Sequence, residues 1–256
     1  MCGIVGAISE RNITPILMEG LRRLEYRGYD SAGIAIFDNS KIQRLRRAGK
    51  VQELQNALDN NPLIGTLGIS HTRWATHGIP TENNAHPHLS EQDIALVHNG
   101  IIENHEVLKK ELLDEGYTFE SNTDTEVVVH RIHFHLASNA DLCTAVNLTV
   151  RELEGAYALA VISKDEPHKM IVARSGCPVV IGKGINENFV ASDVAALLSV
   201  TNNFIFLEDD DVASVEKDKV TVFNSEGIEV SRKVTESKLS SEVTERGEFK
   251  HFMLKE

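Results

Sequence analysis

Nine short runs rich in Val, Ile and Ala, several of them continuously apolar, constrain the fold of this chain more than any other feature. A strand that is covered on both faces needs no polar alternation, so such runs predict β-strands in the interior of a layered protein. The predicted strands span residues 3–8, 33–37, 68–70, 94–98, 156–162, 170–173, 179–181, 204–207 and 220–223.

Helical spacing of apolar residues predicts four helices, over residues 13–25, 104–115, 123–137 and 141–153. Asn104 is a good N-cap for the second of these, and Thr123 with Glu126 fits a capping box at the start of the third. The strands come in consecutive blocks and the helices in pairs, without strict strand–helix alternation. This order favours an α+β fold with mostly antiparallel sheets over a doubly wound parallel sheet.

The composition excludes several classes of protein. The 256 residues include 38 acidic and 26 basic side chains, a formal charge of −12, which argues against a general nucleic-acid binder. No apolar run approaches the roughly 20 residues that span a bilayer, so we expect no membrane segment. Three cysteines form no disulfide framework and favour a reducing, cytoplasmic location.

The domain organisation changes near the end of the sequence. Residues 1–240 show no internal linker or repeat and read as one domain. A polar and charged stretch follows, and Phe249, Phe252, Met253 and Leu254 then restart an apolar pattern. We therefore expect residues 241–256 to be a linker and the start of a second domain that the sequence does not include.

Cys2 stands directly after the initiator Met1 and has a possible chemical role. Removal of Met1 would give Cys2 a free α-amine, which titrates at about 7.7–8.0, close to the thiol at about 8.5. That amine could serve as the general base for the thiol of the same residue. Position alone favours an apolar residue that leads into a buried strand, since free cysteines usually have that role. For Cys143 and Cys177 we predict packing roles only.

Four spaced segments carry a resemblance to a known family. They are Cys2 to Gly6 (CGIVG), Arg22 to Gly33 (RRLEYRGYDSAG), His71 to Gly78 (HTRWATHG) and His98 to Asn104 (HNGIIEN). Together they resemble the class II glutamine amidotransferases, which use an N-terminal nucleophile. They are most similar to members whose second half, a sugar-phosphate isomerase domain, converts fructose 6-phosphate to glucosamine 6-phosphate. The resemblance implies a four-layer αββα sandwich of two mainly antiparallel sheets, of the N-terminal-nucleophile hydrolase type.

The resemblance implies that Cys2 attacks the side-chain amide of L-glutamine, releasing ammonia and leaving a γ-glutamyl thioester that water hydrolyses. It assigns the oxyanion donors to Asn99 and Gly100. From the residues alone, Asn99-Gly100 follows a predicted strand and reads as a sharp turn. Glycine permits close backbone approach at such a point, but without the other motifs an ordinary Asn-Gly hairpin turn is the default interpretation.

The resemblance also assigns residues that hold the two charged ends of glutamine. Arg73 is expected to bind the α-carboxylate, for which a planar guanidinium is well suited. Asp124 is expected to bind the α-ammonium, although a carboxylate there could simply stabilise the positive end of the helix.

Four further residues receive roles by resemblance. Thr76 and His77 are expected to contact glutamine from a loop that closes over it. Trp74, the only tryptophan, is expected to be a lid that excludes water, although it could be a surface-packed aromatic. Arg27 is expected in a supporting loop near Cys2.

The resemblance implies no cofactor and no metal, although His130 and His133 share a helical face. The expected partners are L-glutamine and the sugar-phosphate isomerase domain, with a homo-oligomer for the full-length protein. Two alternatives stay open: the glutaminase half of another class II amidotransferase, and a catalytically silent binding module of the same fold.

Overall fold

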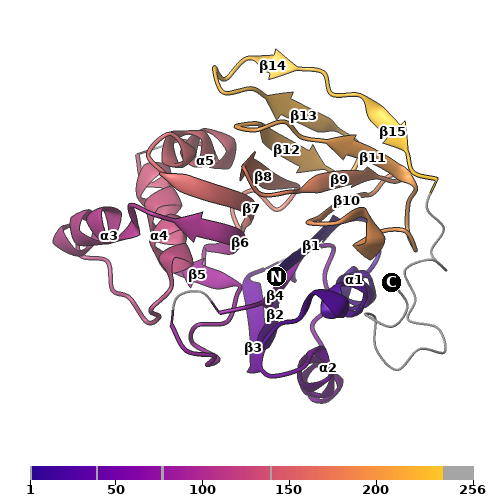
Figure 1. The fold of residues 1–256 in the computed structure, drawn as a ribbon, viewed down its shortest axis with the longest axis horizontal. Helices are drawn as coiled ribbons and strands as arrows, with labels where there is room; N and C mark the ends of the chain where they lie inside the picture. Colours follow the sequence, from indigo (N-terminus) through magenta and orange to yellow (C-terminus); the bar gives the residue numbers. More distant parts are fainter. Residues whose placement is uncertain (1, 39, 76–77, 139, 239–256) are drawn as a thin grey trace.

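The computed structural model describes residues 2–38, 40–75, 78–138 and 140–238 and shows two β-sheets packed face to face, with helices on both outer faces (Figure 1). All paired strands in the two sheets are antiparallel. The predicted α+β, four-layer αββα architecture is confirmed.

The first sheet holds eight strands in the order β15 (Val234–Glu236), β11 (Asn203–Phe206), β9 (Val180–Lys183), β10 (Asn188–Ala191), β1 (Gly3–Ile8), β4 (Leu67–Arg73), β2 (Ser31–Phe37) and β3 (Ile42–Ala48). The second holds seven in the order β14 (Glu229–Val230), β13 (Val220–Phe223), β12 (Val212–Glu216), β8 (Lys169–Ser175), β7 (Gly155–Ser163), β6 (Ile94–Ile102) and β5 (His88–Ser90). β1 therefore lies in the interior of its sheet, where apolar residues on both faces can be buried.

Three buried clusters define the layers. The first lies between the sheets and includes Ile4 and Ile69 from one sheet and Val97 and Ala160 from the other. The second packs the helices α1 (Thr14–Leu24) and α2 (Val51–Asn60) on the outer face of the first sheet. The third packs α4 (Asp124–Leu136) and α5 (Leu142–Val150) on the second sheet, and α3 (His105–Asp114) lies against α4.

The start of α4 tests the capping box predicted for Thr123 and Glu126. The Thr123 side chain caps α4 by accepting the Glu126 N–H at 3.4 Å. The Glu126 carboxylate does not return to Thr123; it accepts the N–H groups of Glu120 and Ser121 at 2.9 and 2.7 Å. Only half of the predicted capping box is therefore formed.

Asn104 occupies the N-cap position of α3, but its side chain makes no capping bond. Its amide instead donates to the Glu152 carbonyl at 2.7 Å and accepts the Glu154 N–H at 3.1 Å. The residue ties α3 to the start of β7 because Glu154 directly precedes that strand.

Several helices and strands were not predicted. The omission of β3 (Ile42–Ala48) is explained by its polar composition. β3 is an edge strand with the sequence IQRLRRA, whose four polar side chains hide the strand pattern. The other omitted elements are α2, β5, β10, β12, β14 and β15. The predicted linker and domain start at 241–256 lie outside the described residues. Within the described segments, we find no helix whose length and apolar character would let it span a membrane.

Candidate active site

The pairing of β1 with β4 places Cys2 beside the end of β4. Gly3 pairs with Thr72, so Cys2, one residue earlier, lies next to Arg73 and Trp74. The Trp74 backbone N–H donates to the Cys2 Sγ at 3.3 Å, and the thiol lies 3.6 Å from the Trp74 carbonyl oxygen. The thiol is therefore held by the backbone of the segment that leaves β4.

The second sheet contributes Asn99, from β6. The Asn99 Nδ2 donates to the Cys2 carbonyl oxygen at 3.3 Å, and the Asn99 side chain is mostly buried. Residues 97 positions apart in the sequence thus meet where the inner faces of the two sheets approach each other. Sequence proximity could not have indicated this contact.

The predicted turn at Asn99-Gly100 is wrong. Both residues lie inside β6, where Asn99 pairs with Ala158 and Gly100 with Tyr157 of β7. Gly100 has φ +123°, and a Cβ there would lie 2.0 Å from the Ala156 carbonyl oxygen. Glycine is required by close strand contact and a positive φ, not by a chain reversal.

A pocket of about 470 Å³ opens beside Cys2. Its lining residues are Cys2, Arg27, Trp74, Asn99, Gly100, Ile101, Cys177 and Pro178. Five of the nine residues predicted for the site line this pocket: Cys2, Arg27, Trp74, Asn99 and Gly100. Cys177, for which only packing was predicted, contacts the inter-sheet core and also lines this pocket.

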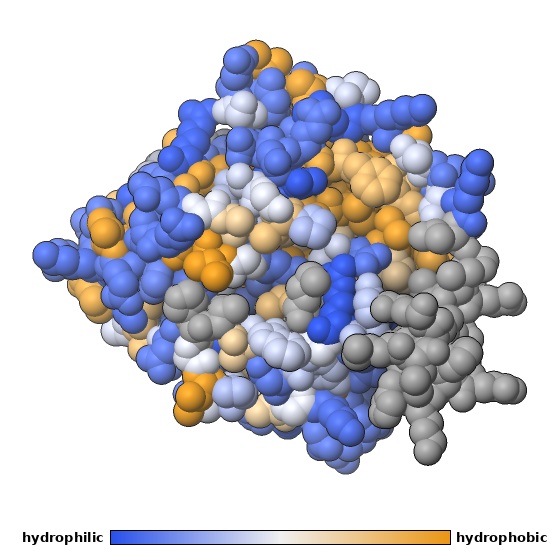
Figure 2. Space-filling view, in the orientation of Figure 1, coloured by the Kyte–Doolittle hydropathy of each residue, from blue (hydrophilic) through white to orange (hydrophobic). Residues whose placement is uncertain are grey.

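Apolar surface also lies over β9 and β11 of the first sheet. Figure 2 shows apolar residues gathered over β9 and β11, and the Phe206 side chain at the end of β11 is 48% exposed. Ile101, in the pocket wall, is also exposed. Apolar surface is thus found both in the pocket wall and over β9 and β11 (Figure 2).

Arg27 is held in the pocket wall by two residues that sequence reasoning missed. Its Nη2 lies 2.6 Å from the Asp193 carboxylate, and its Nη1 donates to the Ser192 hydroxyl at 3.3 Å. Ser192 in turn accepts the Ile4 backbone N–H at 3.1 Å, which connects Arg27 to β1. Asp193 also caps a short 3₁₀ helix, and this capping pattern is the only sequence signal that could have drawn attention to it.

Arg73 and Asp124 do not line this pocket. Arg73 ends β4 and Asp124 begins α4, and each is only 4% exposed. Burial lowers the pKa of Arg73, while the nearby charges of Asp30, Cys2 and Asp124 act in the opposite direction. One Asp124 oxygen accepts the Ile102 N–H at 2.9 Å, so this carboxylate also fixes the end of β6.

Asp30 supports the segment that carries Trp74. Its carboxylate accepts the Ala75 N–H at 2.6 Å, and its own N–H donates to the Arg73 carbonyl at 2.7 Å. The predicted supporting loop therefore braces residues 73–75, although no specific role for Asp30 was predicted. Thr76 and His77 lie outside the described residues.

The electrostatics of Cys2 favour the neutral thiol. Burial raises the pKa of the Cys2 thiol, and the hydrogen bond from the Trp74 N–H and the charge of Arg73 partly oppose this rise. A buried thiol of this kind needs a base to become a nucleophile.

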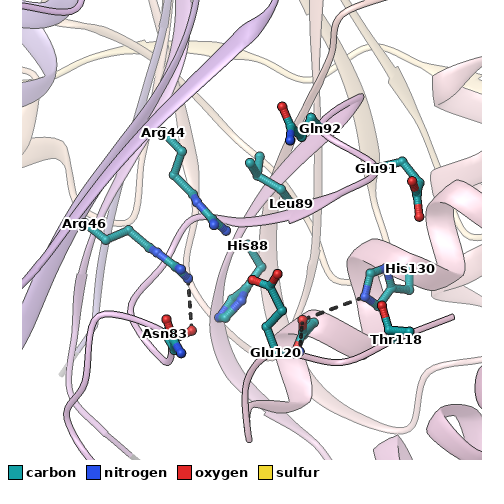
Figure 3. A pocket seen from close by; sticks show the side chains of 11 residues that line it. Arg44, Arg46, Asn83, His88, Leu89, Glu91, Gln92, Thr118, Glu120 and His130 are labelled. Atoms are coloured by element: carbon teal, nitrogen blue, oxygen red, sulfur yellow. Dashed lines mark hydrogen bonds and ion pairs between the residues drawn. The ribbon is translucent and has the colours of Figure 1, made fainter.

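A second pocket, with charged walls, lies at the edge of the sandwich beside β3 (Figure 3). Arg44 and Arg46 extend into it from β3, and burial lowers the pKa of Arg46 to about 10. Arg46 donates to the carbonyl oxygens of Asn83 and Ala85 at 2.9 and 3.0 Å. None of the predicted site residues lines this pocket, and among the described residues no cluster of three or more His, Cys, Asp or Glu could hold a metal ion.

The Trp74 ring packs on Gly28, so a larger side chain at position 28 should displace the ring. A Cβ at Gly28 would lie 2.5 Å from the Trp74 ring, and Gly28 has φ +74°. We expect Gly28→Ala to displace the ring and to shift the tryptophan emission spectrum, which reports this residue alone because the chain has one tryptophan. Gly116→Ala is the matched control, because Gly116 has φ +91° with no atom within 4 Å of its Cβ position. An unchanged spectrum in Gly28→Ala would contradict the packing.

A family model for the glutamine amidotransferase domain matches residues 71–199, which include the end of β4, all of β6 and the predicted residues from Arg73 to Asp124. This match covers half of the chain. The chain belongs to the glutamine amidotransferase domain family. The predicted family is thereby confirmed.

This glutamine amidotransferase domain is also similar in sequence to parts of longer aminotransferases. It is 57% identical to the glutamine–fructose-6-phosphate aminotransferase (isomerizing) of Pseudomonas aeruginosa and 57% identical to that of Shewanella oneidensis. Both matches cover 100% of this chain and 42% of the relative, so the chain spans less than half the length of these proteins.

Among solved structures, the domain resembles the glutamine phosphoribosylpyrophosphate amidotransferase of B. subtilis. The TM-score is 0.71 at 26% identity, over 93% of this chain and 50% of the other. The shared fold extends over nearly the whole domain, although the sequences have diverged widely.

Proposed function

We propose that this domain hydrolyses L-glutamine to L-glutamate and ammonia, with Cys2 as the nucleophile. The proposal is carried by one observation: the Cys2 thiol opens to a pocket whose wall includes the side chain of Asn99 and the backbone of Gly100. Family membership favours glutamine as the substrate.

The proposed first step uses the α-amine of Cys2 after removal of Met1. The amine takes the thiol proton, and the thiolate forms a bond to the side-chain amide carbon (Cδ) of glutamine. The carbonyl oxygen becomes an oxyanion, which the Asn99 Nδ2–H and the Gly100 N–H stabilise. When the carbon–nitrogen bond breaks, the amine returns its proton to the leaving nitrogen, and ammonia departs.

The second step hydrolyses the γ-glutamyl thioester. The same amine takes a proton from water, and the hydroxide that forms attacks the thioester carbon, again through an oxyanion. Breaking the carbon–sulfur bond releases glutamate, and the thiolate regains its proton. Trp74, which is 53% exposed, would act as a lid over this chemistry, with Thr76 and His77 on the same closing loop.

Recognition of glutamine is assigned to Arg73 for the α-carboxylate and Asp124 for the α-ammonium. Both side chains are buried, where a charge pair with a ligand is screened little by solvent. The charge of Asp124 acts to raise the pKa of Arg73, which supports a common site for these two side chains.

Asp124→Asn is expected to raise the KM for glutamine with little change in kcat. The amide oxygen can still accept the Ile102 N–H, so the substitution removes the charge and keeps the fold contact. A hydrogen bond to a charged group contributes about 1.5–3 kcal/mol, so we expect KM to rise roughly 10- to 150-fold. Steady-state glutaminase kinetics measure this effect, and an unchanged KM would remove Asp124 from the binding role.

Beyond hydrolysis, we propose that residues 1–240 form the glutaminase part of a longer protein that transfers the ammonia to fructose 6-phosphate and forms glucosamine 6-phosphate. The 57% identity to two glutamine–fructose-6-phosphate aminotransferases supports this assignment over the phosphoribosylpyrophosphate branch, at 26%. We further propose that residues 241–256 lead into the sugar-phosphate isomerase domain, that the full-length protein is a homo-oligomer, and that its free cysteines fit a cytoplasmic location.

The test is glutamate release from L-glutamine, measured alongside L-asparagine. We expect turnover of glutamine only. The side chain of asparagine is one methylene shorter, so its amide would not reach Cys2 while its α-carboxylate and α-ammonium contact Arg73 and Asp124. Glutamine binding without glutamate release, by a sample that begins at Cys2, would instead favour the catalytically silent module.

A further inference from the structure

We infer that His71 is a positioning residue for the oxyanion hole: its ring N–H orients the Asn99 amide so that the amide nitrogen faces Cys2. The inference rests on the proposed function and adds a residue to it. His71 belongs to β4, and its ring crosses from the first sheet to the second to reach Asn99.

The contact is short and buried. The His71 Nε2 lies 2.9 Å from the Asn99 Oδ1, with the His71 side chain fully buried. On the other side of the same amide, the Asn99 Nδ2 lies 3.3 Å from the Cys2 carbonyl oxygen. The amide is thus held at both ends, by a donor at its oxygen and an acceptor at its nitrogen.

This arrangement fixes which way the amide points. If the amide were rotated by half a turn, the Asn99 Oδ1 would face the Cys2 carbonyl oxygen. Both atoms are acceptors, so no hydrogen bond could form between them. An acceptor oxygen needs a donor, so His71 must carry its proton on Nε2 to complete the observed orientation. An Asn99 amide held this way presents N–H groups to the Cys2 side, where an oxyanion would form.

The charge state of His71 is consistent with this role. Burial lowers the pKa of His71 to about 3, so the ring is neutral at pH 7 and carries a single N–H. The Nδ1 atom is buried and has no hydrogen-bond partner among the described residues. The bond to the Asn99 oxygen therefore favours the Nε2–H tautomer.

The plane of the ring is fixed by its neighbours. The His71 ring stacks on the His86 ring with centroids 4.2 Å apart and planes 23° apart. His86 is held in turn, since its Nδ1 accepts the His98 N–H at 3.3 Å and its Nε2 lies 3.2 Å from the Thr125 hydroxyl. Rotation of the His71 ring away from Asn99 would break this stack.

Three substitutions separate positioning from packing. In His71→Gln the side-chain amide nitrogen can reach the place of Nε2, whereas in His71→Asn it reaches only the place of Nδ1, and His71→Leu has no donor. We expect kcat for glutamine hydrolysis to fall about 10- to 100-fold in the Asn and Leu variants, because small misplacements of reacting groups have effects of this size. We expect KM to change less than about twofold and His71→Gln to restore kcat to within about fivefold of the wild type.

A second readout addresses the oxyanion itself. The γ-aldehyde analogue of glutamine adds the Cys2 thiol and forms a tetrahedral adduct with an oxyanion, whereas L-glutamate binds without one. In His71→Asn, inhibition by the aldehyde should weaken in parallel with kcat, while the affinity for L-glutamate stays unchanged. In an Asn99→Leu background, His71→Asn should cause no further loss of kcat, because the residue it orients is absent.

The outcomes are distinct. A wild-type protein that begins at Cys2 and releases no glutamate overturns the proposed function. An active wild type with unchanged kcat in His71→Leu overturns the positioning role, and so does a His71→Gln variant as slow as His71→Leu. If His71→Leu does not fold, as judged by circular dichroism, the comparison of the Gln and Asn variants gives the same decision.

Discussion

Cys2→Ala is expected to abolish glutamine hydrolysis while glutamine still binds. Removing the thiol removes the atom that forms the γ-glutamyl thioester, and no other described thiol has the same hydrogen bond from Trp74. The variant keeps the α-amine, the Asn99 amide and the buried Arg73. Glutamate release measures the loss, and calorimetry with glutamine measures the binding that should remain.

Cys143→Ala is the matched control for this substitution. Cys143 lies in α5 and packs against the outer cluster of the second sheet, on the other side of that sheet from Cys2. We expect it to retain full turnover, with at most a modest loss of stability. Normal glutamate release by Cys2→Ala would refute the proposed mechanism.

The second large effect is expected at Asn99. Asn99→Leu has nearly the same shape but no amide, so it removes one of the two proposed oxyanion donors. Loss of a single such donor typically raises the barrier by about 2.7–4 kcal/mol, which predicts a kcat about 10²- to 10³-fold lower. KM should change little, because the donor acts on charge that develops in the transition state.

The measurement is single-turnover and steady-state kinetics of glutamate formation in Asn99→Leu. Substitution also leaves the buried His71 N–H without its acceptor, so we expect some loss of stability, and urea denaturation will separate that from the kinetic effect. A kcat within a few-fold of wild type in the folded variant would show that Asn99 is no oxyanion donor.

Several apolar strands could be predicted from their composition, although the buried strands β10 and β12 were missed. β1 was predicted with its observed bounds, and β13 likewise, since both consist largely of apolar or β-branched residues. β3 could not be predicted in this way. Its arginines Arg44 and Arg46 extend into a charged pocket at the sandwich edge, so the strand lacks an apolar face.

For the candidate site, the assignment of roles and the prediction of geometry had different outcomes. Cys2, Arg73 and Asp124 were assigned through the family resemblance, because residue type alone left a packing role for Cys2 and a helix-dipole role for Asp124. Asn99-Gly100 was assigned through the same resemblance, but its predicted geometry was wrong because an Asn-Gly pair is far more typical of a turn than of a strand interior.

Contacts between residues far apart in the sequence account for what was missed altogether. His71 stands two residues before Arg73 in a motif that was noted, yet its contact with Asn99 arises only when β4 and β6 face each other. Ser192 and Asp193 are separated from Arg27 by more than 160 residues. No local pattern carries such information, since it depends on sheet order and register.

The central claim is that the free amine of Cys2 makes its own thiol a nucleophile for glutamine. The most direct test measures intact mass and glutamine hydrolysis on the same sample, for protein that begins at Cys2 and for protein that retains Met1. The account predicts turnover only from the form that begins at Cys2, because Met1 converts the amine into an amide that cannot take a proton. Equal turnover by the form that retains Met1 would contradict it.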